Sequence, residues 1–224
     1  MKKVKWIVLN NRFTLDETID KLNKDPYTEE KGKGFIFEKI RDGFCKGRFV
    51  EKIITEDKVG SLYGDITTIE RIDYRNTSFS IDSQFLPIIT ISNPPRTLKP
   101  FAQAIVKNMG LGVGLEEIEI NPFDWFEPLS KKLSMAVTQL DISQVKVAEF
   151  ALAKMQINSS HDLKKYYLTE LINKDSRLER LTSSISDPNY QGKLKLFRNG
   201  MAHIETKGEA GLIDLLQHCL MTAR

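Results

Sequence analysis

The chain has 224 residues, of which 41% are hydrophobic and 28% charged, and its net charge is +3. This composition is typical of a globular protein and excludes a disordered or collagen-like chain. No apolar run approaches the roughly 18 residues of a membrane-spanning helix, and the apolar run at residues 6–9 is too short for a secretory signal. The two cysteines, Cys45 and Cys219, are too few for a disulfide framework or a cysteine-based zinc site. We therefore expect a reduced, cytoplasmic protein without membrane insertion.

Strand signals dominate the first ninety residues. Residues 4–9 are β-branched and aromatic, which is typical of a strand. Thr14 is followed three residues later by Glu17, the spacing of a capping box, so a helix of about ten residues is expected there. From Gly34 the apolar pattern changes to period two, and an Asp-Gly turn follows at residues 42–43. The sequence then predicts a meander with strands at residues 49–55, 66–74, 77–82 and 86–91.

Helices and strands mix after this meander. The double proline at residues 94–95 ends it, because proline donates no hydrogen bond to a ladder. Asn121-Pro122 is a pair that helices favour at the N-cap and first position. Residues 145–157 fit either a strand or a helix, and we expect an extended segment. The other expected elements are helices at residues 97–108, from 121, at 160–173 and at 212–220, with strands at residues 113–120 and 135–142.

These elements predict an α+β protein of two domains. The first, residues 1–120, is expected to be an antiparallel, β-rich α+β domain with few helices. The second, residues 121–224, is expected to mix strands and helices and to end in an amphipathic helix. No period of 20–50 residues recurs, which excludes a repeat protein.

The sextet Arg198-Asn199-Gly200-Met201-Ala202-His203 is the one catalytic candidate. It resembles the R-x(4–6)-H motif of HEPN ribonucleases, which lies on a helix of an all-helical dimer. That resemblance implies metal-independent RNA cleavage, with His203 as acid or base and Arg198 stabilising charge on the phosphorane. Alternatively, Asn-Gly between alternating segments is the strongest short hairpin signal and favours a type I′ turn. We expect the hairpin, with arms at residues 193–198 and 201–205, and no catalytic residue.

The charge pattern permits contact with a polyanion, because the pI is near 8.7. Arg96 and Lys99 follow the double proline at the start of an expected helix, whose N-terminus favours a phosphate. Neither a metal site nor a cofactor is expected, since the three histidines are scattered and no glycine loop leads from a strand into a helix. The other cations expected to contact phosphates are Lys46, Arg48, Lys131 and Lys132.

The order of features is similar to that of the phage lambda exclusion protein RexA. The similarity starts at residues 34–43, GFIFEKIRDG, and continues through strands, a proline and helix passage, late strands and a final amphipathic helix. It implies a cytoplasmic, dimeric, DNA-binding sensor of phage exclusion without enzymatic residues. We therefore expect a non-enzymatic antiviral-defence protein that self-associates and binds nucleic acid through sequence-independent phosphate contacts. The alternatives are a HEPN-type ribonuclease toxin and a scaffold or adaptor subunit whose activity resides in a partner protein.

Overall fold

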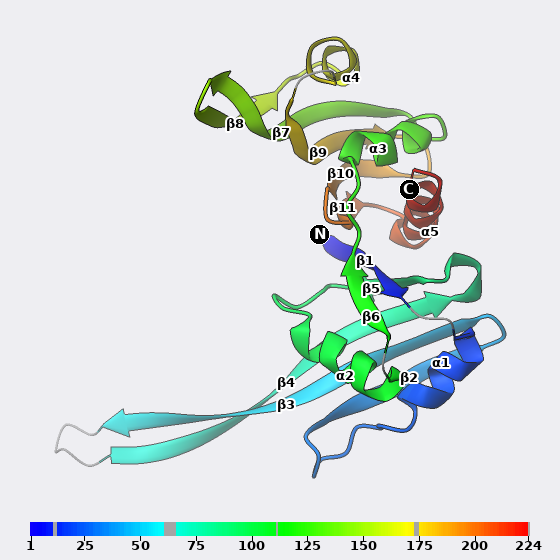
Figure 1. Cartoon of the computed structure of the whole chain (residues 1–224), viewed down its shortest axis with the longest axis vertical. Helices are drawn as coiled ribbons and strands as arrows, with labels where there is room; N and C mark the ends of the chain where they lie inside the picture. The colour runs from blue at the N-terminus through cyan, green and yellow to red at the C-terminus, as the bar shows by residue number, and fades with distance from the viewer. Residues whose placement is uncertain (11–12, 61–65, 111, 173–174, 224) are drawn as a thin grey trace. The chain divides into compact units, whose positions relative to one another are not determined.

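The computed structural model describes the chain except for residues 11–12, 61–65, 111, 173–174 and 224 (Figure 1). It divides into two compact units. Unit 1 consists of Met1–Val8 and Glu116–Arg224, and unit 2 consists of Leu9–Leu115. The first eight residues therefore belong to the same unit as the C-terminal half. The predicted boundary at residue 120 placed them in the first domain instead.

Unit 2 is built on an antiparallel sheet with the strand order β2-β3-β4-β5. Helix α1 (Leu15–Leu22) begins at the predicted capping box, in which the Thr14 hydroxyl accepts from the Glu17 amide and the Glu17 carboxylate accepts from the Thr14 amide. Helix α2 (Lys99–Met109) ends at Gly110. The strands are β2 (Lys33–Arg41), β3 (Phe44–Gly60), β4 (Ile66–Asp82) and β5 (Ile88–Ser92), and a 3-10 turn (Ser83–Phe85) precedes β5.

Four phenylalanines form the core between this sheet and α2. The ring of Phe101, on α2, lies 5.5 Å from the ring of Phe79 and 6.2 Å from that of Phe49. Phe35 on β2 completes the cluster, with its ring 5.1 Å from that of Phe49. All four side chains are at most 2% exposed. The period-two pattern predicted from Gly34 onwards thus places its aromatic residues in one core.

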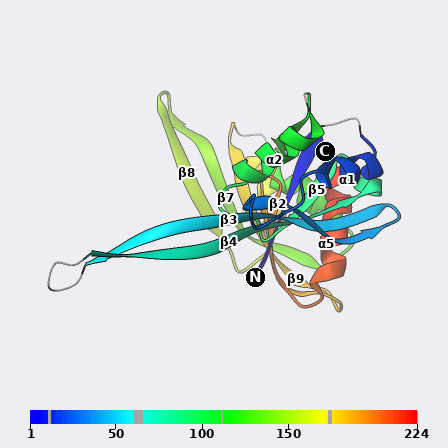
Figure 2. The ribbon, with the colours of Figure 1, turned by 90° about the horizontal axis from the view of Figure 1, so that it is seen from below.

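The distal halves of β3 and β4 extend beyond the neighbouring strands of unit 2 as a two-stranded ribbon (Figures 1 and 2). Strand β2 pairs with β3 only as far as Glu51, and β5 pairs with β4 only over residues 78–81. We call residues 52–60 of β3 and 66–74 of β4 the arm. Its two strands stay in register from the pair Lys52 and Tyr74 to the pair Gly60 and Ile66.

Unit 1 is built on a second run of antiparallel strands, in the order β1-β11-β10-β9-β7-β8. Strand β1 (Lys2–Asn10) and strand β6 (Gly114–Glu117) each cross the boundary between the two units. The other strands are β7 (Met135–Ala148), β8 (Ala151–Asn158), β9 (Arg177–Ser186), β10 (Gln191–Phe197) and β11 (Met201–Thr206). The helices are α3 (Pro122–Ser130), α4 (Lys164–Tyr166) followed by a π-turn (Tyr167–Leu171), and α5 (Glu209–Thr222).

The core of unit 1 lies between its strands and the helices α3 and α5. The rings of Trp6 and Trp125 meet edge to face, with 5.4 Å between their centroids. The indole nitrogen of Trp125 donates a 2.9 Å hydrogen bond to the carbonyl of Leu216 on α5. A row of directly opposite apolar residues on five strands faces this core: Val4, Ala202, Leu196, Leu181 and Leu140.

The expected α+β class is wrong, because strands make up about half of the described residues and helices about a quarter. The fold is instead β-rich and antiparallel. Strands β3 and β4 have 17 residues each, because ladder hydrogen bonds continue through polar stretches in which no apolar alternation predicts a strand. The helix expected at residues 160–173 is shorter, with helical turns over residues 164–171, and its expected end at residue 173 lies outside the described residues. The extended prediction for residues 145–157 is confirmed.

Candidate nucleic-acid interface

Two rows of side chains cross the strands of unit 1 on the side opposite its core. Directly opposite residues in antiparallel strands point to the same face of a sheet. The first row, from β1 to β8, is Lys3, His203, Lys195, Thr182, Gln139 and Asn158. The second row, in the same order, is Lys5, Met201, Phe197, Arg180, Asp141 and Gln156. We call these two rows the polar face. They hold four cations and one carboxylate, but Lys5 is buried and forms an ion pair with Glu117 on β6.

The alternation along β10 shows why the sequence builds this face. Leu194 and Leu196 are fully buried, whereas Lys195, which lies between them, and Phe197, which follows them, are half-buried. Successive side chains of a strand point to opposite sides, so burying the two leucines in the core forces Lys195 and Phe197 onto the polar face. No described residue forms an ion pair with Lys195, and its charge is therefore not cancelled by a carboxylate.

His203 lies at the centre of the polar face. Its ring is 4.6 Å from the ring of Phe197, and the guanidinium of Arg180 lies 5.8 Å from the centre of the Phe197 ring on the same face. Burial lowers the pKa of His203 below 6.5, and the positive charges of Lys3, Lys195 and Arg180 lower it further. The imidazole is therefore neutral at pH 7, and three cations from three different strands surround it.

Several buried polar atoms of the polar face make no hydrogen bond to a described residue. They are His203 Nε2, Arg180 Nε and Thr182 Oγ1. Buried polar groups without a partner are costly, and most are satisfied in folded proteins. Arg180 Nε and Thr182 Oγ1 are therefore donors without an acceptor among the described residues, and both atoms lie beneath the surface of the polar face.

A pocket of about 410 Å³ lies where the polar face meets the turn between β10 and β11. Arg198 Nε and Arg177 Nη2 each lie 3.0 Å from the same oxygen of Glu119, and they hold the pKa of that carboxyl below its ordinary value. Arg180 pairs with Asp141 on the neighbouring strand. The arginines of this pocket are thus compensated by carboxylates, whereas Lys195 is not.

A second pocket, of about 630 Å³, adjoins the first and follows β7 and β8. Asp141 and Glu179 line both pockets. The hydroxyl of Ser143, which lines the second pocket, donates a 2.5 Å hydrogen bond to Glu179. The polar face is therefore bordered on its β7 and β8 side by two pockets that share Asp141 and Glu179.

The expected phosphate contacts of unit 2 lie at two separate places. Lys46 and Arg48, both on β3, share one partner, and their nitrogens lie 3.2 and 3.7 Å from the carboxylate of Glu38. Arg96 and Lys99 are exposed, and Lys99 is the first residue of α2, two residues later than the predicted start at residue 97. The structure thus neutralises the first pair in part and leaves the second pair exposed, with Arg96 before α2 and Lys99 at its first position.

The other expected contacts, Lys131 and Lys132, lie just after α3 in unit 1. Both side chains are exposed, and Lys131 forms an ion pair of 3.1 Å with Glu127 one helical turn earlier. Neither residue belongs to the two rows of the polar face. These lysines therefore provide a matched comparison for the cations that do.

Arg198 and His203 lie on a β-hairpin and not on a helix. Residues 193–197 of β10 pair with residues 201–205 of β11 in an antiparallel ladder. The helical HEPN-type arrangement is therefore wrong, because the two side chains do not share a helical turn. Arg198 lies in the connecting loop beside Glu119, and His203 lies on the polar face.

The hairpin prediction is confirmed, but the predicted two-residue type I′ turn is wrong. The last strand pair is Phe197 with Met201, which leaves a three-residue loop. Only its third residue, Gly200, has a positive φ, +68°. Neighbouring segments use the carbonyls of this loop, since the amide of Trp6 donates to Gly200 and that of Ile120 donates to Arg198, each at 2.9 Å. These distant partners explain why the local Asn-Gly signal gave the wrong turn.

The central residues of the polar face, Lys3, Lys195, Arg180 and Phe197, were not among the residues that the sequence pointed to. The alternation of residues 193–197 was the available signal, because it places Lys195 and Phe197 on one side of a strand. It does not indicate which other strands lie beside β10. The sequence therefore indicates which residues of β10 share a face, but not which residues of the other strands join them on the polar face.

Comparison with known proteins found no family model and no curated protein that matches this chain. Among the residues that the structure describes, no group of histidine, cysteine and acidic side chains is arranged to hold a metal ion. In the same part of the chain, no helix is both long and apolar enough to cross a membrane.

Proposed function

We propose that this chain binds nucleic acid through the polar face of unit 1, by phosphate contacts that do not depend on base sequence. The supporting observation is that Lys3, Lys195 and Arg180 surround the neutral His203 on one face of a sheet. Lysine and arginine side chains provide most phosphate contacts, and counterion release makes such binding favourable. This activity fits the non-enzymatic, self-associating protein of phage exclusion that the sequence led us to expect.

The shape of the site favours single strands over duplex DNA. The major groove of a duplex admits a helix or a two-stranded ribbon, whereas a sheet face with aromatic rings takes splayed bases of a single strand. Phe197 and His203 provide adjoining rings, and Lys195 lies directly opposite His203 on the next strand. We therefore expect the affinity for a single-stranded oligonucleotide to exceed that for a duplex of the same length.

The test is a fluorescence-anisotropy titration with a labelled single-stranded oligonucleotide at about 50 and 200 mM salt. The double variant Lys3→Ala/Lys195→Ala should bind about tenfold more weakly at the lower salt. The slope of log affinity against log salt should fall by about 1.4, because each lost phosphate contact removes about 0.7.

The control is Lys131→Ala/Lys132→Ala, which removes the same charge from unit 1 outside the polar face. Its salt slope should equal that of the wild type. Equal losses in both double variants would mean that general charge, and not this face, causes binding. If the wild type bound no oligonucleotide at micromolar concentration, the proposal would fail, and the adaptor alternative would be favoured.

A further inference from the structure

The arm of unit 2 carries large apolar side chains on its surface. Ile54, Ile69 and Ile72 are 55, 52 and 46% exposed, and Ile54 lies directly opposite Ile72. A two-stranded ribbon alone is at best marginally stable in water. The charges of the arm nearly cancel, which does not favour a polyanion: its cations are Lys52, Lys58 and Arg71, and its acids are Glu56, Asp57, Glu70 and Asp73. The arm is therefore suited to a protein partner.

The outer edge of β4 is unpaired along the arm. Its neighbours in the strand order are β3 on one side and β5 on the other, and β5 begins to pair only at Ser78. Over residues 66–76, no described strand lies on the β5 side. An edge of this length with exposed apolar side chains is a template for another strand.

We propose that this edge pairs, antiparallel, with the same edge of a second copy of the chain, with Ile72 on the two-fold axis. In this register Ile72 meets the partner's Ile72, and Arg71 lies opposite the partner's Asp73. The two-fold axis repeats that contact, so two opposite-charge pairs lie on one face of the joined strands and the Ile72 contact lies on the other. No like charges lie opposite each other. The strand is thus complementary to itself in charge.

Other registers of the same edge are less favourable. A centre at Glu70, Arg71 or Asp73 would place each of these charges opposite itself, which is destabilising. A centre at Ile69 would place Arg71 opposite Thr67 without a charge pair. Within one chain Arg71 and Asp73 lie 3.1 Å apart, with side chains 66 and 53% exposed, so both are accessible on this edge. A centre at Tyr74 would place Asp73 opposite the partner's Arg75, but β5 occupies the edge from Ser78 onwards, so only residues 72–76 could pair, against residues 68–76 for a centre at Ile72. The charge pattern and the extent of the free edge together therefore select Ile72 as the centre.

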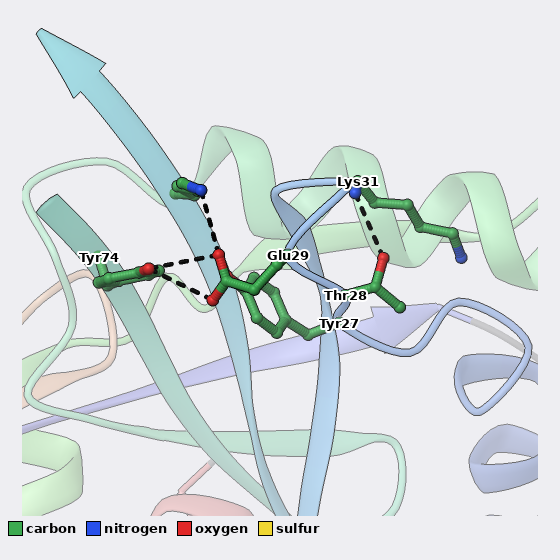
Figure 3. A network of polar contacts seen from close by, with 6 residues as sticks. Tyr27, Thr28, Glu29, Lys31 and Tyr74 are labelled. Atoms are coloured by element: carbon green, nitrogen blue, oxygen red, sulfur yellow. Dashed lines mark hydrogen bonds and ion pairs between the residues drawn. The ribbon is translucent and has the colours of Figure 1, made fainter. Parts of the chain in front are cut away.

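The root of the arm is held by a network of polar contacts (Figure 3). The carboxylate of Glu29 accepts hydrogen bonds from the hydroxyl of Tyr27 at 2.9 Å and from the hydroxyl of Tyr74, on β4, at 3.3 Å. It also accepts one from the ammonium of Lys52, on β3, at 3.1 Å. One side chain between α1 and β2 therefore ties both strands of the arm where they leave the sheet.

The proposal is independent of nucleic-acid binding, and its test contains no nucleic acid. Sedimentation of the wild type at about 50 µM should give twice the chain mass of 25.7 kDa. Arg71→Asp and Asp73→Arg should each weaken the dimer by about tenfold or more, because two attractive pairs become repulsive. An equimolar mixture of the two variants should associate again, because the introduced aspartates then lie opposite the introduced arginines.

Lys58→Glu is the matched control. It reverses a charge on the arm, but on β3, away from the pairing edge, and its dimer should be as strong as that of the wild type. Circular dichroism should show the same strand content in all four proteins, because the substituted side chains are exposed. A monomeric wild type, or a dimer as strong in Arg71→Asp as in Lys58→Glu, would overturn the proposal.

A cross-linking experiment tests the register directly. Residues on the two-fold axis of an antiparallel pair have Cα atoms about 4.5 to 5.5 Å apart, which a disulfide can bridge. Ile72→Cys should therefore form a covalent dimer on mild oxidation, whereas Ile54→Cys on the other strand of the arm should not. The native thiols do not interfere, because Cys45 and Cys219 are buried. Equal cross-linking of both variants, or of neither, would contradict Ile72 as the centre.

Discussion

The imidazole of His203 rests against the ring of Phe197, with 4.6 Å between the ring centroids and 53° between the ring planes. The two residues lie on neighbouring strands at diagonal positions, since His203 is opposite Lys195 and Phe197 is opposite Met201. This contact joins the two rows of the polar face at its centre. The titration of His203 therefore reports on the charges gathered around it.

The depressed pKa of His203 predicts a loss of stability in mild acid. As the pH falls below about 6.5, the unfolded chain protonates this histidine while the folded chain does not, so unfolding is favoured. The free energy of unfolding should fall more between pH 7.5 and 5.5 in the wild type than in His203→Gln. Urea unfolding at each pH measures this difference. An equal decrease in both proteins would show that burial and the neighbouring cations do not depress the pKa.

Gly200→Ala should destabilise unit 1 by about 1 to 3 kcal/mol, because φ is +68° at this position. An added Cβ would also lie 2.9 Å from the Cβ of Ile118 and 3.0 Å from the carbonyl oxygen of Trp6. Asn199→Ala, one residue earlier and without a positive φ, is the control and should change the free energy of unfolding by less than about 1 kcal/mol. Urea denaturation compares them, and similar losses in both variants would exclude strain at Gly200.

The two core tryptophans should respond differently to replacement by phenylalanine. Trp125→Phe leaves the Leu216 carbonyl without its 2.9 Å donor, whereas the indole nitrogen of Trp6 is buried without a hydrogen-bond partner in the described residues. Both substitutions remove the same side-chain volume, and both side chains are fully buried. Trp125→Phe should therefore cost about 1 to 2 kcal/mol more than Trp6→Phe in thermal or urea unfolding. The reverse order would mean that packing around the rings, and not the hydrogen bond, sets the cost.

The network at the root of the arm predicts a local effect of Glu29. In Glu29→Gln at pH 7, hydrogen exchange should become faster in peptides that cover Lys52 and Tyr74, because the charged acceptor is lost. The adjacent exposed Glu30→Gln should exchange like the wild type. Hydrogen bonds from Tyr27 and Lys52 lower the pKa of Glu29, so its contribution is present above the ordinary value of 4.5 and is lost as pH falls through the lowered pKa. At such a pH the wild type and Glu29→Gln should exchange alike, and a difference that persists there would contradict this role.

Local chemistry allowed several elements to be predicted from the sequence. The capping box of Thr14 and Glu17 is formed as predicted, and the side chain of Asn121 caps α3 by accepting from the Phe123 amide at 3.0 Å. The alternation around Leu194 and Leu196 predicted both a strand and its buried face. These features depend on residues at most a few positions apart, so the sequence contains all the partners.

Elements that depend on distant partners were predicted less well. The loop at Gly200 differs from the predicted turn because its carbonyl and that of Arg198 accept from Trp6 and Ile120. The arm is longer than its apolar pattern indicates, since each strand is sustained by pairing with the other through polar residues such as Thr55 and Arg71. In both cases hydrogen bonds formed by tertiary structure outweigh the local preference.

The sequence by itself determined which side chains share a face of each strand, because alternation along a strand is a property of the backbone. The tertiary structure alone decided that Lys3 and His203, at opposite ends of the chain, lie directly opposite each other with Lys195 beside them. Which strands become neighbours, and in which register, depends on hydrogen bonds and core packing between segments far apart in sequence. That long-range pairing, and not any local motif, gathers the cations of the polar face around one neutral imidazole.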